Sequence, residues 1–293
     1  MPEIIFNGPA GRLEGRYQPS KQKSAPIAII LHPHPQFGGT MNNQIVYQLF
    51  YMFQKRGFTT LRFNFRGIGR SQGEFDHGAG ELSDAASALD WVQSLHPDSK
   101  SCWVAGYSFG AWIGMQLLMR RPEIEGFMAV APQPNIYDFS FLAPCPSSGL
   151  IINGDSDKVA PEKDVNGLVE KLKAQKGILI THKTVPGANH FFNGQVETLM
   201  AECEDYLDRR LNGELYLSRQ RSAFAERRRP LLQRCSRPDL LLSCGGLSGA
   251  ESRAFETTVS TKGQVILPRV IRQRLEWDAG TRLIVEETPD GAC

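Results

Sequence analysis

Short apolar runs alternate with amphipathic stretches along the first 213 residues of the chain. The runs are apolar either throughout or at alternate positions, which is typical of strands buried in a sheet. They predict strands at residues 25–32, 59–65, 101–108, 126–132, 149–155 and 178–185. Helical periodicity predicts helices between them, at residues 42–57, 81–96, 109–121, 161–177 and 196–213.

Strands that alternate with helices in this way predict a mostly parallel sheet with helices on both faces. Residues 3–8 and 13–19 are joined by a Gly-rich turn and predict an antiparallel hairpin at the sheet edge. The second helix is expected to begin near Ser83 and Asp84, because both are typical N-terminal residues. We therefore expect an α/β domain over residues 1–213.

This regularity stops after Gly213. Residues 214–254 have no sustained period, contain eight Arg and no Lys, and carry a net charge of +4, whereas residues 1–213 and 255–293 each carry −1. A structureless connection of this length inside a compact domain is uncommon. We therefore predict a disordered, Arg-rich linker over residues 214–254, followed by a small module over residues 255–293.

Composition narrows the class of protein further. Of the 293 residues 41% are hydrophobic, enough for a core, and the formal net charge of +2 argues against a strongly basic nucleic-acid binder. The N-terminal residues lack the pattern of a signal peptide, and the apolar run at 27–31 is far too short to span a bilayer. The six cysteines have no CxxC spacing, which favours reduced thiols. We expect a cytoplasmic protein with no membrane partner.

The strongest candidate for chemistry is the sequence Gly-Tyr-Ser-Phe-Gly at residues 106–110, between an apolar strand and a helix. A nucleophile on a tight strand-to-helix turn requires small residues two positions before and after it, which is the G-x-S-x-G pattern. The helix N-terminus adds free N–H groups and a positive dipole end. Ser108 is the candidate nucleophile, although a Gly-rich turn with an N-cap serine has the same pattern.

A serine nucleophile needs a base and an acid. After a strand-to-helix turn of this kind, the acid is expected first along the chain and the histidine second. Asp155 and Asp157 lie at the end of one predicted strand, and His190 lies just beyond the next. These are carboxyl ends of strands, where open α/β sheets place their sites. We expect Asp157 to be the acid, with Asp155 as the alternative. Each residue alone is better explained by an ordinary turn or a packed loop histidine, but their agreement in order, spacing and position favours a Ser-His-Asp triad.

The loop after the strand at 25–32 is expected to complete an oxyanion hole together with the Phe109 N–H. The two prolines of this loop have no N–H, so His34 or Gln36 must supply the second donor. His32 and His34 form a His-x-His pair, which also fits a metal. With no further ligand at fixed spacing we expect packing or hydrogen-bonding roles, and neither a metal nor a cofactor.

Five motifs carry a resemblance to a known family: LHPHPQFGGT, FNFRGIGRSQG, GYSFG, GDSDKVAP and GANHFF. They span nearly all of residues 1–213, and this region resembles the α/β-hydrolase superfamily, in its small dienelactone-hydrolase-like, predicted bacterial hydrolase branch. The resemblance implies Ser108 as nucleophile, His190 as general base and Asp157 as orienting acid. It also implies hydrolysis of an ester, thioester or related acyl bond of a small-molecule substrate through an acyl-enzyme. It implies no particular substrate, because the fold hosts many.

In that superfamily a cap usually grows between the strands expected here at 126–132 and 149–155. Only about sixteen residues separate them, which predicts a minimal cap and a shallow, open site. Phe139, Phe141 and Leu142 are the candidate apolar lining of this site, or else pack over the core. An open site favours a short acyl chain, or an acyl group on a larger carrier, over a long lipid.

Residues 255–293 have a different pattern, with two short strands around a Lys-Gly turn, a helix opened by Pro268, and a further strand at 281–287. The run TVSTKGQVILPRVIRQRL resembles the AbrB/MazE/VapB swapped-hairpin transcription factors, in which two chains interleave hairpins. The resemblance implies a small β-rich module, partial because a closing strand is missing. The resemblance also implies that basic side chains of this module contact DNA; the alternative is that they are solvated surface charges. These residues are Lys262, Arg269, Arg272 and Arg274.

Two functions follow from these patterns. We favour a serine hydrolase; the alternative is a DNA-binding regulator or antitoxin-like protein whose hydrolase domain senses a ligand without turnover. The aperiodic linker between two motif-rich parts also leads to the hypothesis of a fusion, in which a frameshift or lost stop codon joined a hydrolase to a neighbouring regulator. A homodimer is compatible with both functions.

Overall fold

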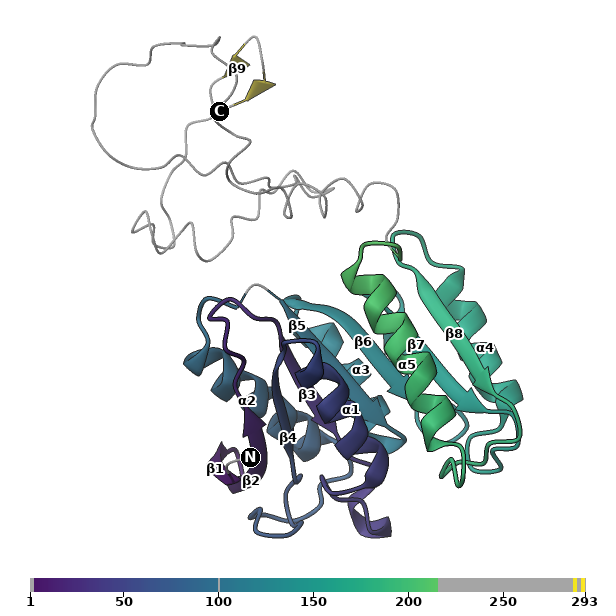
Figure 1. Cartoon of the computed structure of the whole chain (residues 1–293), viewed down its shortest axis with the longest axis horizontal. Helices are drawn as coiled ribbons and strands as arrows, with labels where there is room; N and C mark the ends of the chain where they lie inside the picture. Colours follow the sequence, from purple (N-terminus) through teal and green to yellow (C-terminus); the bar gives the residue numbers. More distant parts are fainter. Residues whose placement is uncertain (1–2, 100, 216–286, 289–290, 293) are drawn as a thin grey trace, which may run out of the picture. The chain divides into compact units, whose positions relative to one another are not determined.

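The computed structural model describes residues 3–99, 101–215, 287–288 and 291–292. The chain divides into two units, residues 1–233 and 234–293. The described part of the first unit contains an eight-stranded sheet with the order β1-β2-β4-β3-β5-β6-β7-β8 (Figure 1). Its strands are β1 (Glu3–Gly8), β2 (Gly11–Gln18), β3 (Ile27–Leu31), β4 (Thr59–Phe63), β5 (Cys102–Tyr107), β6 (Ile124–Val130), β7 (Ser148–Gly154) and β8 (Ile180–Val185).

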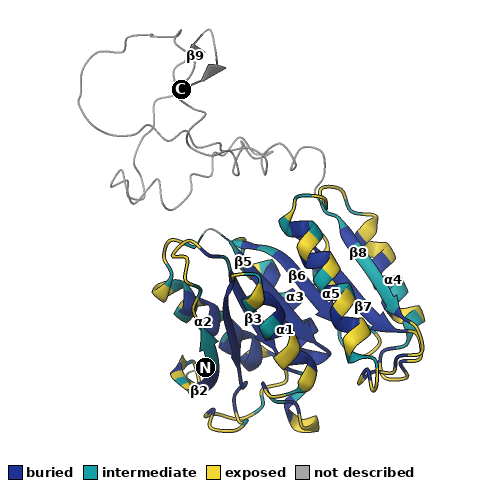
Figure 2. Cartoon of the chain, viewed as in Figure 1, coloured by how far each residue is buried: buried dark blue, intermediate teal, exposed yellow. Residues whose placement is uncertain are grey.

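Helices cover both faces of this sheet. They are α1 (Gln44–Lys55), α2 (Ala79–Leu95), α3 (Phe109–Arg120), α4 (Glu162–Lys173) and α5 (Val196–Leu211). One apolar cluster joins the sheet to α1 and α5, which face the viewer in Figure 1, and a second joins it to α2, α3 and α4. Because both faces are covered, the central strands are buried along their whole length (Figure 2). This burial explains why their sequences are apolar runs.

The pairing directions match the expected arrangement. β1 and β2 form the predicted antiparallel hairpin at the sheet edge, and β2 also pairs antiparallel with β4. Every pairing from β4 through β3 to β8 is parallel. The α/β-hydrolase fold expected for this region is therefore the fold that it adopts.

The start of α2 differs from the expectation. The helix begins at Ala79 rather than near Ser83 and Asp84, because the Glu81 carboxylate accepts hydrogen bonds from the Gly78 and Asp76 N–H groups and caps an earlier turn. Asp84 instead binds Arg66, accepting from its backbone N–H and from its guanidinium. An acidic residue that looked like a helix cap therefore fixes the turn after β4.

The direction in which successive strands are added to the sheet reverses at β3, in the middle of the sheet. From β3 the chain moves to β4 on one side, and it then returns to β5 on the other side of β3. The loops after β3 and β5 therefore diverge at the carboxyl edge, where open α/β sheets form their binding crevice. The segments after β5, β7 and β8 end at the same edge, since these strands are parallel.

In the second unit, the described residues form two short antiparallel strands, β9 (Glu287–Thr288) and β10 (Gly291–Ala292). The candidate DNA-contacting residues and most of the predicted swapped-hairpin module lie outside the described residues, as does most of the predicted linker. Among the helices of the described part, none combines the length and the apolar character that a membrane span requires.

Candidate active site

The turn between β5 and α3 holds Ser108 in a strained conformation. Its φ of 57° and ψ of −116° lie outside the regions that non-glycine residues favour. The flanking glycines are required by close contact between backbones: a Cβ on Gly106 would lie 2.2 Å from the Gly110 carbonyl oxygen, and one on Gly110 would lie 2.4 Å from the Leu31 carbonyl oxygen. The small residues of the G-x-S-x-G sequence therefore have the steric role that the sequence predicted.

Three side chains from three loops form one hydrogen-bonded chain. Ser108 Oγ lies 3.0 Å from His190 Nε2, and His190 Nδ1 lies 2.7 Å from Asp157 Oδ2. All three residues are buried, and the Asp157 side chain has no exposed surface. The structure thus brings together the serine, histidine and aspartate that the sequence singled out.

The two neighbouring aspartates have different surroundings. Asp157 Oδ1 accepts hydrogen bonds from the Val159 and Ala160 N–H groups, both at 2.8 Å, which leaves Oδ2 facing His190. Asp155 is exposed and accepts from the Gly187 N–H at 2.8 Å, so it ties the loop after β7 to the loop that carries His190. Of the two aspartates, Asp157 is therefore the one that contacts the imidazole.

The loop after β3 lies against the first turn of α3. The His34 ring packs on the Phe109 ring with centroids 5.0 Å apart, and the Leu31 and His32 carbonyl oxygens border Gly110. The Gln36 N–H donates to His34 Nδ1 at 3.2 Å and is thereby occupied. Of the two donors left open by the sequence, the His34 N–H is therefore the better candidate to face an oxyanion beside the Phe109 N–H.

His32 is fully buried and holds the backbone of this loop. The Phe65 N–H donates to its Nε2 at 3.0 Å, and its Nδ1 lies 2.6 Å from the Pro33 carbonyl oxygen. Burial lowers the pKa of His32 to about 4, so the ring is neutral near pH 7. Both ring nitrogens of His32 thus contact the backbone. Among the described residues, no group of three or more His, Cys, Asp or Glu side chains is placed to hold a metal ion.

Gln133 is a site residue that the sequence did not single out. It follows β6, the strand beside β5, and its Oε1 lies 3.1 Å from Ser108 Oγ. The end of β6 also accepts a hydrogen bond from the Ser108 N–H at the Val130 carbonyl oxygen, 2.8 Å away. The available signal was position alone, since a polar residue just beyond the strand next to the elbow must lie near the nucleophile.

Exposed apolar side chains flank the hydrogen-bonded residues. Each lies within three positions of His34, Gln133, Asp157 or His190. We call them the apolar rim; the members and their exposed fractions are Phe37 (85%), Ile136 (57%), Val159 (37%) and Phe191 (61%). The Asn135 side chain donates to the Val159 carbonyl oxygen at 3.0 Å and joins two of the loops that carry the rim.

The residues expected to line the site have another place. Phe139 and Leu142 are buried, 7% and 2% exposed, in the apolar cluster on the α2–α4 face, and Phe141 packs against that cluster. Of the two roles that the sequence left open for these residues, packing over the core is the one observed, because the short connection between β6 and β7 folds its apolar residues onto the core. With α4, this connection borders a cavity of about 660 Å³ whose lining includes none of the three hydrogen-bonded residues.

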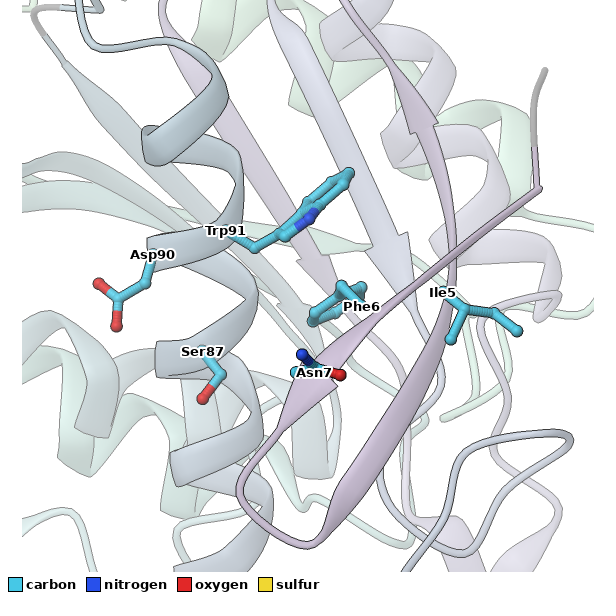
Figure 3. Close-up of a pocket in the computed structure, with 6 residues that line it drawn as sticks. All are labelled: Ile5, Phe6, Asn7, Ser87, Asp90 and Trp91. Carbon is cyan, nitrogen blue, oxygen red and sulfur yellow. The ribbon is translucent and has the colours of Figure 1, made fainter.

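A separate shallow pocket lies between β1 and α2 (Figure 3). It is lined by Ile5, Phe6, Asn7, Ser87, Asp90 and Trp91. The Phe6 and Trp91 rings stack with centroids 5.3 Å apart, while Ile5 points to the other side of β1. Its lining includes one serine and no histidine.

Known proteins show the same fold and family. Residues 15–230 match the protein family described as X-Pro dipeptidyl-peptidase (S15 family). An uncharacterized protein of Rickettsia prowazekii (strain Madrid E) is 51% identical over 211 residues, which are 71% of this chain and 89% of that protein.

Two solved structures extend this likeness. One, from Agrobacterium tumefaciens, is a protein of unknown function described as a candidate α/β hydrolase; it is 92% identical, with 74% of this chain and 100% of its own covered and a TM-score of 0.73. The other, from Xanthomonas campestris, is described as an α/β serine hydrolase without lid; it is 30% identical, with 71% and 94% covered and a TM-score of 0.63. The chain therefore belongs to the S15 family and, with it, to the α/β-hydrolase superfamily.

Proposed function

We propose that the protein is a serine hydrolase that cleaves an ester, thioester or similar acyl bond of a small substrate through an acyl-enzyme. The observation that carries this proposal is the hydrogen-bonded chain from Ser108 through His190 to Asp157 at a strained strand-to-helix turn. Nucleophile, base and orienting acid in this geometry are the recurring arrangement of acyl-transfer enzymes.

The proposed reaction follows from the contacts. Ser108 Oγ attacks the acyl carbon while its proton passes to His190 Nε2, 3.0 Å away. Asp157 holds the Nδ1 side of the imidazole and stabilises its positive charge. His190 then protonates the leaving oxygen or sulfur, and water repeats the sequence to release the acid. The Phe109 and His34 N–H groups bind the oxyanion in both halves of the reaction.

The substrate is proposed to carry a modest apolar group beside the reacting carbonyl. The apolar rim supports this, because its exposed side chains adjoin the site residues in sequence, and Phe37 and Phe191 contact the His34 and His190 rings. The short connection between β6 and β7 supports an open site, and the Xanthomonas campestris relative is described as lacking a lid. We therefore expect short acyl chains, or an acyl group on a larger carrier, to be preferred over long lipids.

A labelling and hydrolysis experiment tests the proposal. The full chain is treated with a fluorophosphonate probe and assayed on a panel of p-nitrophenyl esters of increasing chain length, thioesters, lactones and X-Pro dipeptide p-nitroanilides. We expect labelling at Ser108 and highest activity on short acyl chains, with both lost in Ser108→Ala. A wild-type chain that is neither labelled nor active on any of these substrates would contradict the proposal. Maximal activity on long chains would contradict the open site.

A further inference from the structure

One hydroxyl at the site has two hydrogen-bonding neighbours. Ser108 Oγ lies 3.0 Å from His190 Nε2 and 3.1 Å from Gln133 Oε1. Both of these atoms would accept a hydrogen bond if the imidazole is neutral. A serine hydroxyl has one hydrogen and therefore cannot donate to both.

The other side of the imidazole determines which neighbour receives that hydrogen. A carboxylate only accepts hydrogen bonds, so His190 Nδ1, 2.7 Å from Asp157 Oδ2, must carry a hydrogen. Nε2 of the neutral ring is then the acceptor, and attack requires that the Ser108 hydrogen points to it. An oxygen of Gln133 facing Oγ competes for the same hydrogen and would direct it away from the base.

A glutamine amide can resolve this conflict by turning over. Its oxygen and nitrogen ends have nearly the same shape, and the nitrogen end donates two hydrogens. With Nε2 toward Ser108, Gln133 donates an N–H to a lone pair of Oγ and leaves the hydroxyl hydrogen for His190. With Oε1 toward Ser108, the hydroxyl is held in an unreactive orientation.

We propose that Gln133 is a positioning residue whose side-chain N–H, turned toward Ser108 Oγ, directs the serine hydrogen to His190 in the reactive state. This inference rests on the proposed function. As the bond from Oγ to the acyl carbon forms, the O–H bond breaks, its hydrogen moves to His190 Nε2, and the carbonyl electron pair moves to the oxyanion. Gln133 keeps both of its own hydrogens throughout.

Hydrogen bonds hold the backbone on both sides of Gln133. Its carbonyl oxygen accepts from the Ile136 N–H at 3.0 Å and the Tyr137 N–H at 2.9 Å, so it begins a closed turn. Two residues earlier, Ala131 has a φ of 46° and donates to the Ile152 carbonyl oxygen at 2.7 Å. Gln133 itself is 6% exposed. The amide can turn about its last bond while the rest of the residue stays fixed.

Two substitutions separate this role from simple packing. Gln133→Met keeps the length of the side chain and removes the donor, and Gln133→Glu offers only acceptors near neutral pH. The measurements are the second-order rate of fluorophosphonate labelling and the acylation burst with a p-nitrophenyl ester, as functions of pH. We expect Gln133→Met to slow both about five- to tenfold with KM within about twofold, the effect of one hydrogen bond.

The Glu variant gives the sharper result. Its carboxylate attracts the hydroxyl hydrogen and places a negative charge beside His190, so we expect it to react more slowly than Gln133→Met. We also expect the acid limb of its pH profile to move to higher pH. Rates of Gln133→Met within about twofold of wild type, or of Gln133→Glu at or above those of Gln133→Met, would overturn the inference.

The matched control is Gln175→Met. Gln175 is a second glutamine that binds the connection between β6 and β7, through the Leu142 carbonyl oxygen and the Cys145 N–H, each at 2.7 Å. Its substitution should leave both rates unchanged. A wild-type chain that neither labels nor hydrolyses would refute the proposed function. Normal wild-type rates with unaffected Gln133 variants would refute this inference alone.

Discussion

The two sides of Ser108 along the sheet edge contribute to the site in opposite ways. On the β3 side, the backbone at Leu31 and His32 lies against Gly110 in the first turn of α3, and the His32 and His34 rings bind backbone groups of this region. On the side of β6, β7 and β8, the Gln133 and His190 side chains contact the Ser108 hydroxyl. The His190 ring is held by the Asp157 carboxylate, which in turn accepts two backbone N–H groups.

This contrast shows that the same residue type has different roles on the two sides. His32 and His190 are both buried histidines at the ends of parallel strands. Both nitrogens of His32 contact backbone groups, whereas His190 joins two side chains. Substitutions on the β3 side should therefore change activity by altering the backbone, and those on the opposite side by altering the side chain that contacts Ser108 or His190.

The largest effect is expected on the side-chain side. Asp157→Asn keeps the shape of the residue but replaces an acceptor of the His190 Nδ1–H by an amide, which favours the wrong imidazole tautomer. We expect kcat on a short p-nitrophenyl ester to fall by about 10⁴-fold. Asp155→Asn is the matched control, because Asp155 contacts neither Ser108 nor the His190 ring; its carboxylate accepts from the Ser156 hydroxyl and the Gly187 N–H, and an asparagine oxygen can still accept there. Equal losses in the two variants would contradict the assignment of the acid.

The next effect tests the backbone side. His34 has a φ of −53°, close to the value that proline requires, so His34→Pro removes the N–H with little change of conformation. If this N–H binds the oxyanion, kcat should fall by about 10²- to 10³-fold. His34→Ala keeps the N–H and should lose only a few-fold in kcat, from weaker packing against Phe109. Similar kcat values for the two variants would show that the ring, and not the N–H, is the functional group.

A third prediction concerns the stability of the backbone side at low pH. In the unfolded chain His32 binds a proton near its ordinary pKa of 6.5, whereas in the folded protein burial lowers the pKa to about 4. The unfolded state therefore binds more protons below pH 6.5, and the free energy of unfolding falls as the pH drops from about 6.5 to 4. Between pH 7 and 4.5 this amounts to roughly 2 to 3 kcal/mol.

Urea unfolding of the wild type and of His32→Gln at both pH values isolates this contribution. The variant does not titrate at this position, so its free energy of unfolding should fall less over the same interval. The difference between the two slopes matters rather than the absolute stability, because His34, His96 and His182 also have lowered pKa values and remain in both proteins. Identical slopes would show that His32 is accessible to protons in the folded state.

The same two sides differ in how far the sequence could predict them. The turn that carries Ser108 is a local feature. Gly106 and Gly110 are needed because the backbone contacts itself within five residues and also contacts the end of the adjacent strand. A short sequence motif is therefore enough to predict it. The apolar runs report strands because helices cover both faces of the sheet. The approach of the loops that carry Ser108, Asp157 and His190 was predictable because parallel strands place the loops at their carboxyl ends at one edge of the sheet.

Contacts between distant residues that belong to no motif were not predicted in this way. Gln133 reaches a serine 25 positions away, and Tyr107 reaches a carbonyl group 83 positions away. The start of α2 was misjudged for the same reason, since Asp84 binds Arg66, 18 positions earlier, instead of capping its own helix. In each case a polar residue with an ordinary local interpretation has a partner that only the assembled sheet provides.

The smallest effect is expected for Tyr107, whose hydroxyl binds the backbone of His190. Its hydroxyl donates to the His190 carbonyl oxygen at 2.8 Å, and burial, reinforced by the Asp157 charge, raises the pKa of Tyr107, so the group remains a donor across the working pH range. Tyr107→Phe leaves that buried carbonyl unpaired and loosens the loop that holds the imidazole. We expect a loss of about 1 kcal/mol in stability and about fivefold in kcat, with little change in KM.

Tyr17→Phe is the control that separates positioning by Tyr107 from stability. Tyr17 also contacts a histidine, His96, but on β2 at the far side of the sheet. Its loss should lower the melting temperature without changing kcat measured well below that temperature. If both variants lose stability but only Tyr107→Phe loses kcat, then Tyr107 orients the base. If kcat is unchanged in both, the His190 side chain is held by Asp157 alone, and the side-chain half of the site is simpler than its contacts indicate.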